Sequence, residues 1–302
     1  KTTLYLLTDL PSGGSFNFEL RKGEPDVFPN ILVEKKKNEI IVQTDKLSVW
    51  FPSSQEGAVE TLSGPVLGIS QNGKAKMGSS IFKAGQKNLK KLETKIVSKG
   101  PLFAEVEVNY QFTDGSFYRA NVRCINTYDF VEVKEVMEGF SNEGQTGWEI
   151  RWDNFLPTHR QAPNHPYKHH YTPLNDTPGF YRFNWETVDQ STLSSHHGIT
   201  LAGSDGAIPF EIGVYGNWPA ERVVTSTVFW DDKVMQSVGI FMQDASLWND
   251  NEYSIWSVSG KLEVKFYYSN NELTWIFPVY DGQRSTAISC YPHQNDIDYM
   301  DE

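Results

Sequence analysis

The chain has 302 residues, a formal net charge of −11, a hydrophobic content of 39% and a high aromatic content of 14%. The acidic balance excludes a nucleic-acid partner from our expectations, and no stretch approaches the roughly eighteen apolar residues that a membrane-spanning helix needs. The length allows one large domain or two, and the aromatic content favours β-structure because rings fit pleated surfaces.

Residues 1–30 form an expected entry segment. Two short apolar runs, TLYLLTDL and SFNFEL, flank the turn signal Pro-Ser-Gly-Gly, and a Gly- and Pro-containing stretch follows from Lys22 to Asn30. We therefore expect entry strands and a crossover over residues 1–30, and one β-sandwich domain over residues 31–302. Because the chain starts at Lys1 without a Met, we expect a processed secreted protein or a piece of a longer one.

Alternating apolar and polar residues then predict strands. The segment NEIIVQTDKLSVWFP has a two-strand pattern, and QNGK is a hairpin-turn signal. Between Lys74 and Lys99 lie eight of the 27 basic residues and a single acid, Glu93. Two interpretations are open. We favour a lysine-guarded sheet edge, which discourages strand-to-strand aggregation, over a basic patch that faces an anionic polysaccharide.

The clearest pattern runs from Phe103 to Val136. Strict alternation around the turn Asp114-Gly115 predicts three long antiparallel strands with one buried face. Later segments repeat short β-patterns at intervals of roughly eight to twelve residues, and no segment keeps a helical period over three turns. The predicted fold class is all-β, a large antiparallel two-sheet sandwich with little helix.

The stretch from Gly147 to His197 concentrates unusual side chains. It holds six of the seven histidines and three tryptophans, with four prolines between Leu156 and Pro173. Long loops in compact domains are often functional or disordered, and the aromatic residues argue against disorder. We expect an ordered loop, from Trp148 to Tyr171, that walls a groove for an oligosaccharide.

Within that stretch, rings can stack on sugars, an imidazole can act as a general base, and an Arg can hold a carboxylate in a bidentate fork. The candidate substrate-binding residues are Trp148, Trp152, Arg160, His169 and Trp185. The candidate catalytic residues are His159, His165 and Tyr167. The alternative is that the tryptophans belong to the core, that the charged face of GWEIRW pairs with a neighbouring strand, and that the histidines are hydrogen-bonded spacers.

The two cysteines, Cys124 and Cys290, are predicted to be unpaired, with Cys124 a buried thiol. Neither has the spacing of a zinc site, and the doublets His169-His170 and His196-His197 point apart if they lie on strands. We therefore expect no metal and no cofactor.

The order of the segments resembles the galactose-mutarotase-like β-supersandwich of bacterial polysaccharide-degrading enzymes. The resemblance covers Asp26 to Pro292 and rests on the strand texture and on the "GP-strand-DG-strand" block from Gly100 to Phe140. Such sandwiches occur in α-mannosidases, glycoside phosphorylases, hyaluronate-type lyases and rhamnogalacturonan exolyase-like proteins, often beside a catalytic helical toroid. The sequence has no toroid pattern, so the resemblance implies a module that acts beside a downstream catalytic domain.

The resemblance further implies a carbohydrate-binding or structural module of a secreted or periplasmic polysaccharide lyase or glycoside hydrolase. Its partner would be an oligosaccharide or polysaccharide, acidic if Arg160 binds a uronate. One alternative is a stand-alone lyase or mutarotase-like epimerase that uses the His/Arg/Tyr loop with His159, His165 and Tyr167 as catalytic residues. In lyases, His-and-Tyr pairs abstract a proton from the sugar and protonate the leaving oxygen. A second alternative is a cell-surface adhesion or assembly protein. Whether the chain is itself an enzyme stays open.

Overall fold

The structure is a computed structural model that describes residues 30–57, 61–140 and 146–155, and then separate segments. These segments are residues 159–164, 168–173, 208–212, 226–231, 236–242, 264–269 and 272–292. Side chains are described up to residue 155 and then at 228–229, 236–241 and 273–292. The expected entry strands before residue 30 lie outside the described residues, so the division of the chain at residue 30 stays a prediction.

The predicted all-β antiparallel fold is confirmed. Every element in the described part of the chain is a strand, and every strand pairing there is antiparallel. Consequently, no helix that could cross a membrane is found in that part.

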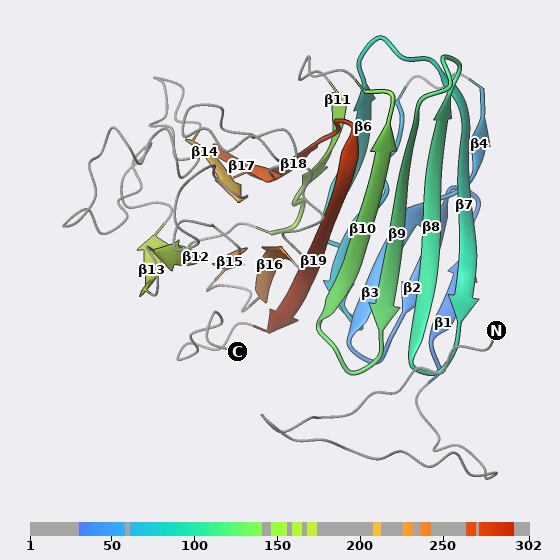
Figure 1. The fold of residues 1–302 in the computed structure, drawn as a ribbon. Helices are drawn as coiled ribbons and strands as arrows, with labels where there is room; N and C mark the ends of the chain where they lie inside the picture. Colours follow the sequence, from blue (N-terminus) through green and yellow to red (C-terminus); the bar gives the residue numbers. More distant parts are fainter. Residues whose placement is uncertain are drawn as a thin grey trace, which may run out of the picture.

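One layer of the fold is a ten-stranded sheet (Figure 1). Strands β7 to β10 form a meander in it, and β19 joins β10 from the far end of the chain. In spatial order the strands are β13 (Lys168–Pro173), β12 (His159–Asn164), β15 (Ser226–Asp231), β16 (Gln236–Met242), β19 (Gly282–Pro292), β10 (Phe130–Glu138), β9 (Phe117–Ile125), β8 (Phe103–Phe112), β7 (Leu89–Lys99) and β4 (Gln55–Glu56).

The second layer is divided into two smaller sheets, and its strands β1 to β3 cross behind β7 to β10 in Figure 1. The four-stranded sheet contains β1 (Leu32–Lys35), β2 (Glu39–Gln43), β3 (Leu47–Pro52) and β5 (Gly68–Gln71). The five-stranded sheet contains β14 (Ile208–Ile212), β17 (Val264–Ser269), β18 (Glu272–Pro278), β11 (Thr146–Arg151) and β6 (Ser79–Ala84).

The core lies between the two layers and follows the predicted alternation. Strands β8 and β9 bury every second residue, as the fully buried pair Val106 and Val122 illustrates. Phe82 of β6 stacks on Tyr110 of β8, with 4.6 Å between the ring centroids. Apolar side chains of the second layer therefore close over the inner face of the ten-stranded sheet, which leaves its other face free for polar residues.

An ion pair lies inside this core. Arg284 of β19 and Glu135 of β10 stand opposite each other in register, and both side chains are fully buried. Arg284 Nε and Nη2 donate to Glu135 Oε2 and Oε1, each at 2.5 Å, and Arg284 Nη1 donates to the Pro278 carbonyl at 2.9 Å. The Tyr118 hydroxyl and Trp148 Nε1 also donate to Oε1, at 2.7 and 3.0 Å. Such complete hydrogen bonding is what allows a charged pair to stay buried.

The segment expected as a loop contains a hairpin, so the expectation of a continuous loop from Trp148 to Tyr171 was wrong. β12 pairs with β13, with Pro163 opposite His169. A proline inside a sheet removes one donor of the hydrogen-bond ladder. β12 pairs with β15 only over residues 159–161, so Pro163 lies beyond that pairing. The prolines are therefore compatible with strands here.

The prediction for the cysteines is confirmed. Cys124 of β9 and Cys290 of β19 are both buried and unpaired. Burial raises the pKa of the Cys290 thiol to about 12 and raises the pKa of Cys124 well above its usual range. Both therefore serve as small apolar core residues.

Candidate functional site

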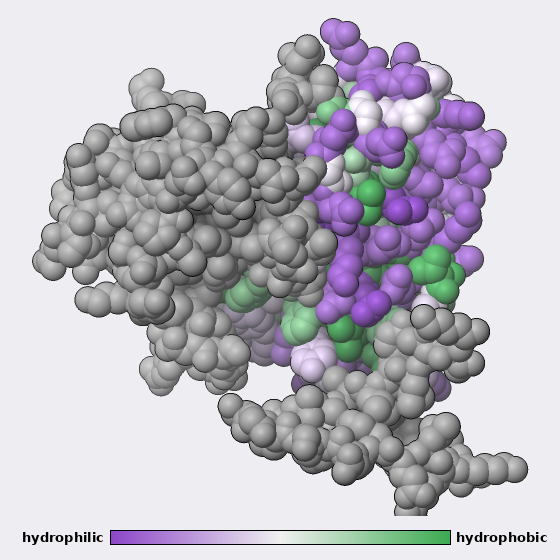
Figure 2. Space-filling view, viewed as in Figure 1, coloured by the Kyte–Doolittle hydropathy of each residue, from purple (hydrophilic) through white to green (hydrophobic). Residues whose placement is uncertain are grey.

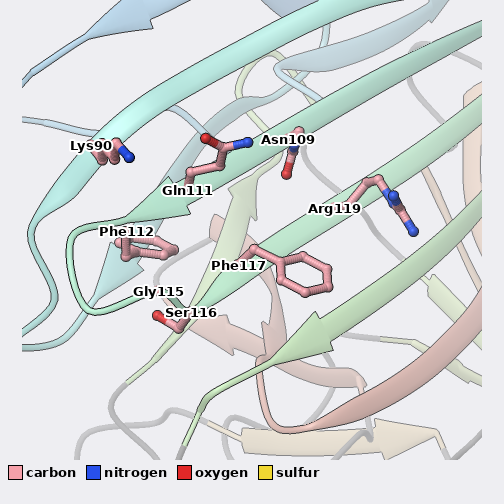
Figure 3. Close-up of a pocket in the computed structure, with 8 residues that line it drawn as sticks. All are labelled: Lys90, Asn109, Gln111, Phe112, Gly115, Ser116, Phe117 and Arg119. Carbon is pink, nitrogen blue, oxygen red and sulfur yellow. The ribbon is translucent and has the colours of Figure 1, made fainter.

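The candidate site is an open pocket on the outer face of the ten-stranded sheet, the face turned away from the second layer. It has a volume of about 380 Å³ and lies where β7, β8 and β9 approach the β8–β9 turn. Figure 2 shows that this face is mostly hydrophilic, with small hydrophobic patches. The pocket is lined by Lys90, Asn109, Gln111, Phe112, Gly115, Ser116, Phe117 and Arg119 (Figure 3).

Strand alternation and hairpin register bring the central side chains of the pocket together. Asn109 and Gln111 of β8 stand opposite Arg119 and Phe117 of β9, respectively. These four residues alternate with buried neighbours, so their side chains share the outer face. The pocket thus combines two amides, a ring and a guanidinium within two paired strands.

A bulge adds a further polar group, the Lys90 ammonium. β7 shifts register between Leu89 and Lys91, so that Lys90 is an extra residue on this strand. A bulge bends its strand and redirects a side chain that regular alternation would place elsewhere. In Figure 3 the Lys90 side chain lies beside Gln111 at the edge of the pocket.

The β8–β9 turn closes one end of the pocket. Gly115 has a φ of 91°, a region that glycine enters readily. Asp114 Oδ1 accepts hydrogen bonds from the Ser116 amide and hydroxyl at 3.0 and 2.6 Å, and Asp114 Oδ2 accepts one from Lys87 at 2.5 Å. The Lys87 ammonium, followed by the two Ser116 donors, holds the pKa of Asp114 well below its usual range. The ionised carboxylate therefore fixes the turn on which the pocket depends.

Two polar atoms in the pocket have no hydrogen-bond partner. Asn109 Oδ1 and Arg119 Nε are both buried, and neither makes a hydrogen bond. The Arg119 guanidinium lies over the Phe117 ring, 5.9 Å from its centroid, and Phe117 remains partly exposed. An unmet buried donor or acceptor costs about 1–3 kcal/mol. Asn109 and Arg119 therefore keep unused hydrogen-bonding capacity beside the pocket that they line.

Farther along the same face, charges are neutralised by neighbouring strands. Arg123 donates to Glu105 at 3.0 Å and to Glu132 at 3.4 Å. Glu93 bridges Lys91 and Lys95 at 2.9 and 2.6 Å. Hydrogen bonds from Lys95 and Lys91 lower the pKa of Glu93, and the hydrogen bond to Glu93 raises the pKa of Lys95. These pairs form a polar surface beside the pocket.

The structure places two of the predicted binding residues in the core. Trp148 stacks on Phe277 at 3.7 Å between ring centroids, and its indole N–H is the donor to Glu135. Trp152 packs against Trp275 at 4.6 Å in an edge-on arrangement. The exposed fractions of Trp148 and Trp152 are 0% and 2%, so neither ring is accessible to a sugar. This agrees with the alternative that these tryptophans are core residues.

One of the two charged residues between these tryptophans, Glu149, also follows that alternative. Glu149 forms an ion pair with Lys83 of the neighbouring strand β6, and Arg151 pairs with Asp153 at 2.9 Å. The alternation of GWEIRW therefore predicted the two faces correctly.

The other predicted site residues stay predictions, because the structure does not describe their side chains. His159 and Arg160 lie on β12 and His169 lies on β13, and their side chains are not described. His165, Tyr167 and Trp185 lie outside the described residues. Within the described ranges, no group of three or more His, Cys, Asp or Glu residues could hold a metal ion.

The comparisons with known proteins show no family. No protein-family model matches the chain, and no curated protein matches it. Among solved structures, the chain is similar to α-N-acetylgalactosaminidase NagBb from Bifidobacterium bifidum in complex with GalNAc, with 9% identity and a TM-score of 0.42. The Gal-NHAc-DNJ complex of NagBb gives 7% identity and a TM-score of 0.39. Each comparison covers 87% of this chain and 36% of the other, so the chain spans about a third of their length. The site is therefore judged on its own residues.

Proposed function

We propose that this chain is a glycan-binding β-sandwich domain, and that the outer-face pocket of β7, β8 and β9 holds one sugar residue of the glycan. The observation that carries this proposal is the pair of unpartnered atoms, Asn109 Oδ1 and Arg119 Nε, beside the partly exposed ring of Phe117. A sugar offers hydroxyls, which both donate and accept, and apolar C–H faces, which pack on rings. Pockets with a few convergent polar groups beside a ring are typical ligand sites.

The expected affinity is modest. Stacking on a ring contributes roughly 1–3 kcal/mol by analogy with stacked bases, and a hydrogen bond to a charged donor contributes about 1.5–3 kcal/mol. Together these give about 2.5–6 kcal/mol, or dissociation constants from about ten millimolar to tens of micromolar, which is sufficient for a module tethered to a catalytic domain, because tethering raises the effective concentration. This supports the role of an accessory domain, related to the galactose-mutarotase-like supersandwich, in a secreted or periplasmic glycan-degrading enzyme.

The alternative function is a glycan-active enzyme that uses His159, His165 and Tyr167, with Arg160 and His169 as binding residues. The specific observation in its favour is the β12–β13 hairpin, which brings the backbones of 159–160 and 169 into one short ladder. The pocket and the β12–β13 hairpin can be distinguished in one experiment, because different substitutions should weaken glycan binding at each.

Titration calorimetry of the whole chain against neutral and acidic oligosaccharides tests both. If the pocket is the site, Asn109→Ala and Phe117→Ala weaken binding several-fold while Arg160→Ala does not. If only Arg160→Ala weakens oligosaccharide binding, the binding site is the β12–β13 hairpin instead of the pocket. If no oligosaccharide binds the folded chain, the proposed function is wrong. Turnover of any oligosaccharide, lost in His159→Ala, would show an enzyme.

A further inference from the structure

The pocket is positively charged in a chain that is strongly acidic. Its lining contains two basic residues, Lys90 and Arg119, and no Asp or Glu, whereas the chain carries a formal charge of −11. In the described part of the chain, neither Lys90 nor Arg119 forms an ion pair with a carboxylate.

The carboxylates around the pocket lie outside its lining. Glu93, which stands opposite Asn109 in register, is already bound by two lysines. Glu138 stands opposite Phe117 at the far end of β10, and it is exposed and outside the lining. The lining itself therefore holds two cations and no carboxylate, an arrangement that attracts anions most strongly at low ionic strength.

We propose that the pocket selects an anionic group of the glycan, a uronate carboxylate or a sulfate ester, and that Arg119 is its specificity-determining residue. This inference rests on the proposed glycan-binding function. The Arg119 guanidinium lines the pocket and its Nε makes no hydrogen bond, so this side chain is the group that donates to the oxyanion. Asn109 Oδ1 accepts from a neighbouring sugar hydroxyl, and Lys90 adds charge at the rim. A charge-assisted hydrogen bond from Arg is shorter and stronger than one between neutral groups.

The ring of Phe117 supports this assignment. It lies 5.9 Å from the Arg119 guanidinium, close enough for a cation–π interaction that holds the guanidinium in place. A donor that is already positioned loses less conformational entropy when the anion binds. Lys at the same position would keep the charge without the planar fork or the Nε donor.

The test uses matched pairs of probes, one anionic and one neutral at the group in question. An oligogalacturonate is compared with the same oligosaccharide after methyl esterification of its carboxyls, and a sulfated oligosaccharide is compared with its desulfated form. Binding of each probe to the whole chain is measured by calorimetry at low and high salt. The first pair tests carboxylate and the second tests sulfate as the anionic group.

The variants are Arg119→Gln, Arg119→Lys and Asn109→Asp, with Lys134→Gln as the control. Lys134 is an exposed residue of β10 that lies outside the pocket lining. The parent should bind one anionic probe about tenfold or more tightly than its neutral counterpart. Arg119→Gln and Asn109→Asp should lose this preference, Arg119→Lys should keep part of it, and Lys134→Gln should keep all of it. Thermal unfolding of each variant verifies that it is folded.

The failure of this inference differs from the failure of the proposed function. If charged and neutral probes bind equally, and Asn109→Ala weakens both, the pocket binds glycans without selecting charge and the inference is overturned. A preference that survives in folded Arg119→Gln and Asn109→Asp also overturns it, since the anion then binds elsewhere. If neither the charged nor the neutral probes bind, the proposed function fails together with the inference.

Discussion

Replacing Glu135 by Gln should destabilise the fold by about 3–5 kcal/mol, because it leaves Arg284 charged inside the core without a carboxylate. The two side chains are fully buried, and Glu135 accepts four hydrogen bonds, two of them from Arg284. Gln keeps the shape and one acceptor but removes the negative charge. A loss of this size is a large part of the roughly 5–15 kcal/mol that stabilises a typical domain.

The double variant Glu135→Leu/Arg284→Met separates charge from packing. It removes both charges, and replacing a complete buried pair by apolar residues is often close to neutral. The hydroxyl of Tyr118 and the indole N–H of Trp148 would lose their acceptor, at about 1–3 kcal/mol each. We therefore expect the double variant to be destabilised by clearly less than the sum of the losses in the single variants Glu135→Leu and Arg284→Met.

Urea unfolding followed by tryptophan fluorescence measures these differences. The matched control is Glu132→Gln on the same strand, where the side chain is partly exposed and paired with Arg123. That control should change the free energy of unfolding by less than about 1 kcal/mol. A Glu135→Gln variant within 1 kcal/mol of the parent, or a double variant as unstable as the sum of the singles, would refute the reasoning.

Three further predictions follow from single positions. The thiols of Cys124 and Cys290 should not react with a thiol reagent until the chain unfolds, because both are buried with raised pKa values, and rapid labelling of the native chain would contradict this. Cys124→Ser should lower the free energy of unfolding by about 1–3 kcal/mol, because it places a hydroxyl in an apolar site. Burial raises the pKa of Asp129, so the folded state binds the proton of this carboxyl more tightly than the unfolded state does. Stability therefore falls as the pH rises from the ordinary carboxyl pKa of the unfolded state through the raised pKa of the folded state. Asp129→Asn should therefore stabilise the chain above the raised pKa and have little effect below the ordinary carboxyl pKa, as pH-dependent urea unfolding would show; an equal effect at both ends is the contrary result. Gly139 has a φ of 82°, and a Cβ there would lie 2.6 Å from the Ser116 Cβ, so Gly139→Ala should lower the melting temperature, whereas Gly57→Ala, also at positive φ but in open space, should lower it less.

The sequence by itself determined the strand faces and the turns of the central meander. Alternation from Phe103 onward separates buried from outward positions, and Asp114-Gly115 is the β8–β9 turn. These features are local, since a side-chain period of two and a glycine with positive φ act within a few residues. The fold class followed in the same way, whereas the unpaired cysteines were predicted from composition. The β12–β13 hairpin could not be predicted locally in place of the expected loop, because a strand tolerates a proline only where its partner strand does not need the missing N–H donor, and this depends on which part of β12 is paired.

Only the tertiary structure decided which faces are core and where the candidate site lies. Alternation put Trp148 and Trp152 on one face but could not show that this face is buried in the core between the two layers. Glu135 and Arg284 are 149 positions apart, and their contact depends on the register between β10 and β19. Likewise, the pocket combines a hairpin register with a bulge at Lys90, and the charge that Lys90 and Arg119 retain depends on which carboxylates neighbouring strands bring near them. Long-range register is a property of the assembled sheet, so no short window of the sequence contains it.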